Sequence, residues 1–335
     1  MVFYYIEEPC RDGFGWNNER KRGIKKKVND LKGVLSVVTV KEALQLAPRS
    51  AVIVNSFSVE WTKRCVSLLL TAGMRPVQMT ESDETSFVYF DCKREYGACF
   101  DALDRFAGEL PVAFFGKDTI SVRDSIKIDL FSRHYGKKAI FFDSPFSREP
   151  LDADKIGAAF ASNDIIGIGL IEFFEKKGLN IPICCPISTS VGRLYKNRFL
   201  HFTIDNFTIG EQAVTLAAYL TKNRNVNSIS AFVNVEDTLS SVSAPTYTVC
   251  EGDDYLLSDN VEKIYTVNGI LAKSDETDLL IIRALSENKS VNKISEELFM
   301  GETTVKYRIM KLFGTLSLRQ CRSTSRMVME MLRKS

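Results

Sequence analysis

The sequence predicts an α/β fold with two lobes, each a parallel sheet flanked by helices, followed by a small all-α domain that contains a helix-turn-helix. Three observations support this fold class. The chain has 335 residues, which is long for one compact domain. Short apolar strands alternate with amphipathic helices up to about residue 235. From Lys273 onward the pattern is purely helical.

The alternating part contains strands that are apolar at almost every position. Such strands are typical of parallel sheets covered on both faces by helices, and one sheet rarely needs so many units, so two lobes are favoured. The expected strands are residues 2–6, 34–40, 51–54, 76–79, 87–90, 112–115, 139–142, 157–161 and 183–185. The expected helices are residues 16–31, 59–72, 95–106, 124–135 and 165–177.

A change in composition places the domain boundaries. Residues 236–270 are rich in Ser and Thr and break the alternation of strands and helices. We therefore divide the chain into a two-lobed domain over residues 1–240, a connector over 241–270 and a helical domain over 271–335.

The composition excludes several classes of protein. Hydrophobic residues make up 45% and charged residues 26%, the balance of a soluble globular protein. The start of the chain lacks the pattern of a signal peptide, and no stretch approaches the roughly 20 apolar residues of a membrane helix. The eight cysteines form no CxxC pair and no metal-ligand spacing with the histidines. We expect a cytoplasmic protein with no metal and no cofactor.

Charge is distributed unevenly. Residues 271–335 carry 12 Lys and Arg against 8 Asp and Glu, whereas the rest of the chain carries 32 against 34. A basic tail on a mildly acidic body is typical of a nucleic-acid reader with a separate sensor, although chance alone produces an excess of this size about as often.

Aromatic and polar residues follow the first and third expected strands. Because parallel strands end at one edge of a sheet, we expect these residues to line a cleft between the lobes and to contact a small molecule. They are Glu7, Phe14, Trp16, Asn55 and Phe57. Trp61, which follows the third strand, is a further candidate for stacking on a ligand. For both tryptophans the alternative is packing between the lobes or in the core, which is favoured equally with ligand contact for Trp16 and favoured over it for Trp61.

A polar turn follows the strand at residues 157–161. In it, Asn163 and Asp164 precede a helix, and Asp164 can cap the free amides of that helix, which stabilises a helix start by about 1 kcal/mol. On the residues alone, capping is the favoured role of Asp164, and ligand binding is the alternative.

The segment AAFASNDIIGIGLIEFFEKKGLNIP at Ala158 resembles the core of LacI-type repressors, which has a periplasmic-binding-protein type I fold. Four further segments resemble that core in the same order: SAVIVN at Ser50, GMRPVQM at Gly73, FVYFDCKREYGACFDAL at Phe87 and FTIDNFTIGEQAVTLAAYL at Phe202. The resemblance covers about residues 50–222. It implies a two-lobed sensor with an effector, sugar-like in this family, held between the lobes.

The same resemblance implies further effector contacts at particular positions of the sensor. Lys127 stands where the family usually has an arginine. The implied residues are Asp91, Lys127, Asn163, Asp164, Asp205 and Asn206. The sequence departs from the family at Leu130, where a glycine is usual, and at Ser188 and Thr189, where an acidic pair is usual, so the sugar-binding set is incomplete.

Three helices are expected at residues 275–286, 291–298 and 303–313, with a short turn that contains Gly301 between the last two. Two helices joined in this way form a helix-turn-helix, whose second helix enters the major groove of DNA. The residues expected to contact DNA are Thr303, Thr304, Lys306, Tyr307, Arg308 and Lys311. The alternative is a solvated helix face of a small bundle.

The segment KISEELFMGETTVKYRIMKLFGTLSL resembles the core of LuxR/GerE-type DNA-binding domains, and the similarity extends over about 60 residues to a final helix near 320–332. The resemblance implies that the helical domain binds duplex DNA. The sequence departs from the family at Asp278, Gly301 and Ser317, where Glu, Ser and Gly are usual. In LacI-type repressors the helix-turn-helix comes first, so the order is inverted here.

A reader of two half-sites is normally a two-fold dimer, so we expect a homodimer. Either the sensor lobes or the last helix supplies the contact, and the sensor is favoured as the larger surface. The apolar residues of the last helix are Met327, Val328, Met331 and Leu332.

Together these features predict a ligand-responsive transcription regulator. The chain has only His134 and His201 as imidazole bases, and it has neither a Gly-rich phosphate loop nor a GxSxG elbow, so we expect no enzyme. Two alternatives stay open: an enzyme that uses carboxylates alone, and a protein-binding scaffold whose helical tail docks a protein partner.

Overall fold

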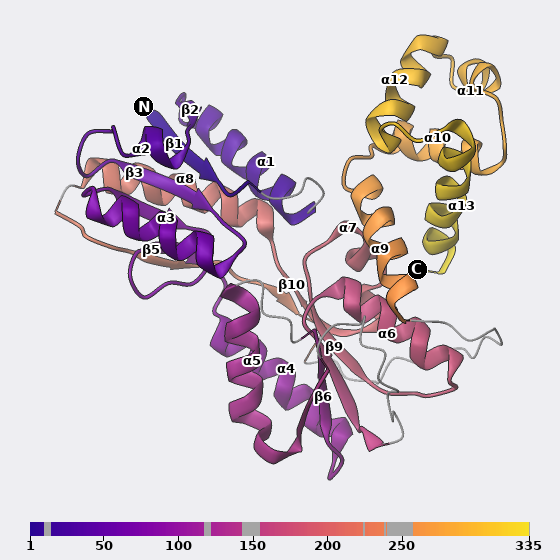
Figure 1. Ribbon diagram of the computed structural model, residues 1–335, viewed down its shortest axis with the longest axis horizontal. Helices are drawn as coiled ribbons and strands as arrows, with labels where there is room; N and C mark the ends of the chain where they lie inside the picture. Colours follow the sequence, from indigo (N-terminus) through magenta and orange to yellow (C-terminus); the bar gives the residue numbers. More distant parts are fainter. Residues whose placement is uncertain are drawn as a thin grey trace.

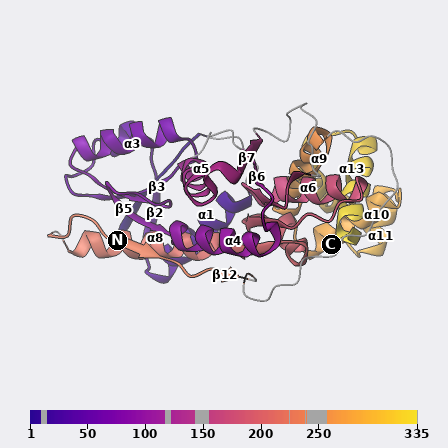
Figure 2. The ribbon, with the colours of Figure 1, turned by 90° about the horizontal axis from the view of Figure 1, so that it is seen from below.

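The computed structural model describes residues 1–9, 15–116, 122–142, 155–223, 225–237, 239 and 257–334. Figure 1 shows two α/β lobes and a separate helical domain. Seen from below in Figure 2, the parts follow one another along the long axis, with the helical domain at the end beyond the second lobe.

Lobe 1 is built on a fully parallel sheet whose strands run in the order β11-β5-β4-β3-β1-β2. The strands are β1 (Val2–Glu7), β2 (Val34–Val37), β3 (Ala51–Asn55), β4 (Arg75–Gln78), β5 (Ser86–Tyr89) and β11 (Ser230–Phe232). The helices are α1 (Gly15–Asp30), α2 (Val40–Ala43), α3 (Val59–Thr71) and α8 (Asn206–Lys222).

Helices α1 and α8 lie side by side in lobe 1, and two glycines allow their close approach (Figure 1). A Cβ added at Gly23 would lie 2.0 Å from the carbonyl oxygen of Phe207, and one added at Gly210 would lie 2.2 Å from the carbonyl oxygen of Arg20. Any larger residue would force the helices apart. This contact places the first turns of both helices together at one end of lobe 1.

Lobe 2 has a second sheet in the order β12-β10-β9-β8-β6-β7, parallel except for β12. The strands are β6 (Val112–Phe115), β7 (Ala139–Phe142), β8 (Ala158–Ala161), β9 (Ile183–Ile187), β10 (Leu200–Thr203) and β12 (Glu236–Asp237). The α-helices are α4 (Cys92–Ala107), α5 (Val122–Tyr135), α6 (Asp164–Lys176) and α7 (Ser190–Leu194), with 3-10 turns at Gly136–Lys138 and Lys196–Arg198.

The chain crosses between the lobes after β5, after β10 and between β11 and β12. At the first two crossings it leaves the carboxyl end of a strand and enters a helix of the other lobe. Ligands of open α/β sheets bind beyond the carboxyl ends of the strands, so the crossings mark the region in which a ligand site is expected.

The helical domain follows helix α9 (Leu257–Leu271). It contains α10 (Glu276–Ser286), α11 (Val291–Glu297), α12 (Glu302–Phe313) and α13 (Leu318–Lys334). Ile264, Val267 and Ile270 of α9 are buried, and they belong to one apolar cluster that runs from lobe 2 through α9 into the helical domain. Helix α9 therefore joins the two parts through a continuous core.

The predicted fold class is confirmed: two sheets flanked by helices and a helical region at the end of the chain. Some boundaries differ. The strand expected over 34–40 ends at Val37, because Thr39 forms a capping box with Glu42 and starts α2. Of the connector expected over 241–270, residues 257–270 are helical and belong to α9. Among the described helices, none has both the length and the apolar character that a membrane crossing needs.

Candidate functional site

The polar residues that end β1 and β3 lie next to each other in lobe 1, because Glu7 pairs with Asn55 in the register of the two strands. Asn55 is 2% exposed. Its side-chain amide donates to the Tyr5 hydroxyl at 3.0 Å and to the Asn17 side-chain oxygen. Two residues predicted for ligand binding, Glu7 and Asn55, are thus brought together by strand pairing.

The guanidinium of Arg20 occupies the centre of this group, and its side chain is 1% exposed. Its Nε donates to the Asn206 side-chain oxygen at 3.0 Å, and its Nη1 donates to that of Asn55 at 3.5 Å. Its Cζ lies 4.9 Å from the ring centroid of Trp16 and 5.8 Å from that of Tyr89. A buried cation needs such compensation, and here amide oxygens and ring faces supply it.

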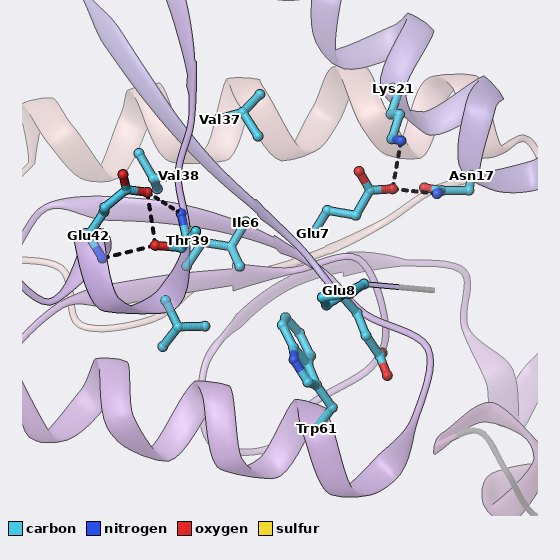
Figure 3. A pocket seen from close by; sticks show the side chains of 12 residues that line it. Ile6, Glu7, Glu8, Asn17, Lys21, Val37, Val38, Thr39, Glu42 and Trp61 are labelled. Carbon is cyan, nitrogen blue, oxygen red and sulfur yellow. Dashed lines mark hydrogen bonds and ion pairs between the residues drawn. The ribbon is translucent and has the colours of Figure 1, made fainter. Parts of the chain in front are cut away.

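A line of polar contacts connects this centre to the edge of lobe 1. The Asn17 amide donates to Glu7 Oε1 at 2.5 Å, and Lys21 Nζ lies 2.7 Å from the same oxygen (Figure 3). Because Asn17 also contacts Asn55, the contacts run from Lys21 through Glu7, Asn17 and Asn55 to Arg20.

Asn206, the first residue of α8, comes from the second crossing between the lobes and is fully buried. Its side-chain nitrogen has no hydrogen-bond partner within the described part of the chain. A buried amide donor without a partner costs free energy, and a hydroxyl or carbonyl oxygen placed there would recover it. Asn206 therefore carries a buried donor whose hydrogen bond the described residues leave unmade.

Of the aromatic residues predicted for the cleft, Trp16 is close to Arg20 and Phe57 is close to Trp16. The rings of Trp16 and Phe57 are stacked, with centroids 6.4 Å apart and an angle of 20° between the planes. Trp16 is 7% exposed. Phe14, predicted with them, lies outside the described residues.

In lobe 2, Asn163 and not Asp164 caps helix α6. The Asn163 side chain accepts the amide of Ile166 at 3.0 Å. The Oδ2 atom of Asp164 instead accepts the amides of Ser188 and Thr189, at 2.9 and 2.7 Å, and the Thr189 hydroxyl at 2.8 Å. The capping role predicted for Asp164 is corrected: this carboxylate holds the loop that precedes α7.

Asp164 is fully buried, and burial raises its pKa, while the hydrogen bonds from Ser188 and Thr189 oppose that rise. Lys127 is also buried; its ammonium donates to the Ser162 carbonyl at 2.5 Å and lies 2.9 Å from Asp124 Oδ1. Asp164 and Lys127, both predicted to bind a ligand, thus make these polar contacts within lobe 2.

The remaining predicted residues, Asp91 and Asp205, are helix caps. Asp91 accepts the amide of Arg94 at the start of α4, and Asp205 accepts the amide of Thr208 at the start of α8. Each comes directly after a crossing, so capping fixes the point at which the chain enters the other lobe.

Sequence reasoning missed three residues of the site: Arg20, Asn17 and Tyr89. A signal for Arg20 was present. It lies one helical turn from Trp16 and one from Ile24, on the stripe of α1 that faces the core. A charged residue on an apolar stripe indicates a buried partner, although the pattern does not say which one.

The lobes are joined beside this site by contacts from α1. Glu19 and Arg193 of α7 form a two-point ion pair, with N–O distances of 2.7 and 2.9 Å. A Cβ added at Gly15 would lie 3.3 Å from the Cβ of Ala272, just after α9. The Asn268 side chain of α9 accepts the Val191 amide of α7 at 3.4 Å. Helix α9 thus contacts both lobes.

Helix α12 of the helical domain has a buried and an exposed side. Val305, Leu312 and Phe313 are buried. Of the six residues predicted to contact DNA, five are exposed: Thr303, Thr304, Lys306, Tyr307 and Lys311. Lys306 lies 3.1 Å from Glu302, one turn earlier on the same helix.

Two of the predicted DNA contacts, Arg308 and Lys311, bind the start of α10. Arg308 Nη1 lies 2.8 Å from Asp275 and 2.7 Å from Asp278, and Lys311 Nζ lies 2.8 Å from Asp278, which is fully buried. Burial alone would raise the pKa of Asp278, but hydrogen bonds from Lys311 and Arg308 outweigh it and hold the pKa below its usual value. Both cations stabilise the contact between α10 and α12.

The apolar stripe predicted on the last helix is used within the chain. Val328 and Met331 are buried where α13 packs on α10, and the Tyr195 hydroxyl of lobe 2 donates to the Met331 carbonyl at 3.5 Å. The stripe therefore packs α13 against α10 within the helical domain, and Met331 also connects α13 to lobe 2.

Among the described residues, one group of side chains has metal-ligand chemistry: Asp101, Asp104 and His134, whose donor atoms lie within 4.8 Å of one another. All three are exposed, and His134 Nε2 lies 2.8 Å from Asp104 Oδ2. None of them belongs to the sites described above.

The sequence matches no protein-family model and no curated protein. The fold is similar to solved structures. The LacI family transcriptional regulator CCPA from Weissella paramesenteroides, with bound sucrose, aligns with TM-score 0.56 and 14% identity over 74% of this chain and 99% of its own. A LacI family transcriptional regulator from Enterococcus faecalis V583, with bound ribose, aligns with TM-score 0.56 and 12% identity over 75% of this chain and 100% of its own. GanP, a glucose-galactose binding protein from Geobacillus stearothermophilus, aligns with TM-score 0.53 and 13% identity over 71% of this chain and 98% of its own. At these identities the likeness concerns the fold alone.

Proposed function

We propose that this chain is a cytoplasmic, ligand-responsive transcription regulator and not an enzyme. The two lobes bind a small molecule, and the helical domain binds duplex DNA through a LuxR-type helix-turn-helix. The observation that carries the proposal is the exposed side of α12, where Thr303, Thr304 and Lys306 point away from a packed core beside a sensor-like α/β body.

The polar centre of lobe 1 supports a neutral, hydroxyl-rich effector, and we propose a sugar-like molecule. Asn206 offers an unpaired donor, Asn55 and Glu7 offer acceptors, and Trp16 and Phe57 lie beside them. Sugars are bound by combinations of amide groups, carboxylates and aromatic faces. Two of the structurally similar regulators hold a sugar, which agrees with this choice.

We propose that α9 carries the signal. It packs on α6 and α7 of lobe 2, reaches the start of α1 in lobe 1, and shares a core with the helical domain. A ligand that changes the angle between the lobes changes the surface on which α9 rests. The helical domain then moves with α9 as one body, because buried apolar contacts connect them.

We further propose a homodimer formed by the sensor. The edge strand β2 presents Val34 and Val37, which are 63% and 68% exposed, and Val2 and Leu31 are exposed nearby. Exposed apolar residues on an unpaired strand edge are typical of an interface. The stripe of α13, in contrast, is already buried against α10.

The experiment that tests DNA binding uses the full chain and random duplex DNA over a series of salt concentrations. We expect the logarithm of affinity to fall linearly with the logarithm of salt concentration, and Lys306→Ala to reduce the slope by about one unit, for one lost phosphate contact. Lys63→Ala, an exposed lysine on α3, is the matched control and leaves the slope unchanged. Binding that is absent at low salt contradicts the proposal.

A second candidate is a helical domain that docks a protein. Phe299, in the turn before α12, is 97% exposed, and Met310 on α12 is 59% exposed. Such residues favour a protein surface over a phosphate backbone. A chain that fails to bind duplex DNA at any salt concentration supports this candidate.

A further inference from the structure

Lobe 1 contains a cavity of about 410 Å³ that lies outside the Arg20 centre (Figure 3). It lies at the carboxyl ends of β1 and β2, between the start of α1, the turn before α2, and α3. Small-molecule sites have volumes of a few hundred Å³ and mostly apolar walls. Here the apolar wall consists of Ile6, Pro9, Val37, Val38, Val40 and Trp61.

The charged lining of the cavity is mainly acidic: Glu7, Glu8 and Glu42 face a single ammonium, that of Lys21. Each carboxylate is held in place. Glu8 accepts the amides of Phe57 and Ser58, at 2.6 and 2.9 Å, at the start of α3. Glu7 accepts Asn17 and lies against Lys21.

Glu42 is the third fixed carboxylate. It accepts the backbone amide and the hydroxyl of Thr39, both at 2.8 Å, and the backbone hydrogen bond, followed by that of the hydroxyl, holds the pKa of Glu42 below its usual value. It therefore stays charged at neutral pH. Figure 3 shows Glu42 and Glu7 on opposite sides of Ile6.

Trp61 supplies the feature that distinguishes this cavity from a plain acidic surface. Its indole projects from α3 toward Ile6 and Glu8 (Figure 3). An indole face attracts cations and also covers apolar groups, so an aromatic ring beside carboxylates selects an ammonium with a hydrocarbon body. Anions are repelled by the same carboxylates.

We propose that this cavity binds a small organic amine, with its ammonium at the carboxylates and its hydrocarbon part against Trp61 and the valines. The site adjoins the proposed sugar-like site at Arg20, with which it shares Glu7 and Asn17, and it is independent of DNA binding by the helical domain. Glu7 belongs to both regions, through Asn17 and Asn55. An amine that displaces Lys21 from Glu7 would therefore alter the hydrogen bonds that run from Glu7 through Asn17 and Asn55 to Arg20.

The test uses the full chain with Trp16→Phe, which leaves Trp61 as the only tryptophan of two. Benzylamine and 1,5-diaminopentane are titrated while Trp61 fluorescence is followed, and calorimetry records the same titrations. Benzyl alcohol and pentane-1,5-diol are the neutral controls. We expect saturable binding of at least one amine and no binding of the alcohols.

Two variants locate the charge. Glu42→Gln keeps the capping hydrogen bonds but removes the charge, and we expect the affinity for the amine to fall about fivefold. Glu109→Gln, an exposed carboxylate of lobe 2, leaves the affinity unchanged. The proposal is overturned if neither amine binds in the fluorescence and calorimetric titrations, or if the alcohols bind as tightly as the amines. It is also overturned if Glu42→Gln leaves the affinity for the amine unchanged. Sugar and DNA binding are measured separately, so their failure leaves this test intact.

Discussion

The carboxylate of Glu19 and the guanidinium of Arg193 form a two-point ion pair that joins α1 of lobe 1 to α7 of lobe 2. Glu19 directly precedes Arg20 in the chain and lies on the same helix as Trp16. Because α7 also contacts α9, the pair lies close to the contact between lobe 2 and α9.

Reversing one charge of this pair should weaken the link, and reversing both should restore it. We expect Glu19→Arg and Arg193→Glu each to lower the free energy of unfolding, and the double variant to recover about 0.5–1 kcal/mol, the size of a partly exposed bidentate pair. Denaturant unfolding of the full chain measures this coupling. Additive single effects would mean that the pair contributes nothing to stability.

Enlarging Gly15 should disturb α9. Its missing Cβ would lie 3.3 Å from the Cβ of Ala272, so Gly15→Val overpacks the contact and costs about 1–3 kcal/mol. Ala272→Gly in the same chain should recover part of the loss. Hydrogen–deuterium exchange of the α9 backbone amides reports the docking of α9. Equal exchange in the Val variant and the natural chain would contradict the contact.

Lys311 should matter for stability more than for DNA. Lys311→Met leaves the buried Asp278 with Arg308 alone, and we expect a loss of about 1 kcal/mol, reduced by the partial exposure of Lys311. Lys306→Met, whose partner Glu302 is exposed, should cost less than about 0.5 kcal/mol. Thermal unfolding compares the two, and a smaller loss for Lys311→Met would contradict this assignment.

Acid should loosen the same contact. Hydrogen bonds from Arg308 hold the pKa of Asp275 below its usual value, and Lys311 and Arg308 outweigh burial to do the same for Asp278. Groups with a lowered folded pKa stabilise the fold above the unfolded pKa, about 3.9, and that stabilisation is lost as pH falls through the folded pKa. Melting temperatures between about pH 6 and pH 3 should therefore fall less steeply in Asp275→Asn than in the natural chain. Parallel curves would rule out Asp275 as a contributor.

Ligand-dependent thermal shifts should separate the two lobes. A sugar at 100 times its dissociation constant should stabilise the fold by about 2.7 kcal/mol. Arg20→Met removes donors of the polar centre and should abolish that shift. Asp164→Asn keeps one oxygen to accept from Ser188 and Thr189 but replaces the carboxylate by a weaker acceptor, so we expect a lower melting temperature. The ligand-dependent shift should be retained, because Asp164 makes these contacts within lobe 2. Loss of the shift in Asp164→Asn alone would place the ligand in lobe 2.

Much of the architecture could be predicted from the sequence, because strand ends and helix starts carry local signals. Glu7 and Asn55 end apolar strands and meet by pairing, as the alternation of strands and helices predicts. The roles of Arg20 and Asp164 could not be predicted in this way. Arg20 meets Asn206 only because α1 packs along α8, and Asp164 meets Thr189 only because β8 and β9 are neighbours. Such long-range contacts leave no local pattern.

The apolar core that α9 shares with lobe 2 and the helical domain also determines where the chain can be divided to make chimeras. A chimera that exchanges the helical domain at residue 271 would retain Ile264 and Val267 on lobe 2 but would remove the contacts of α9 with α13. A cut before residue 257 would expose the apolar surface of α6 instead. An exchange of the helical domain between this chain and another protein therefore needs α9 and the lobe 2 surface that it packs on to be transferred together, so the transferable unit is larger than residues 271–335.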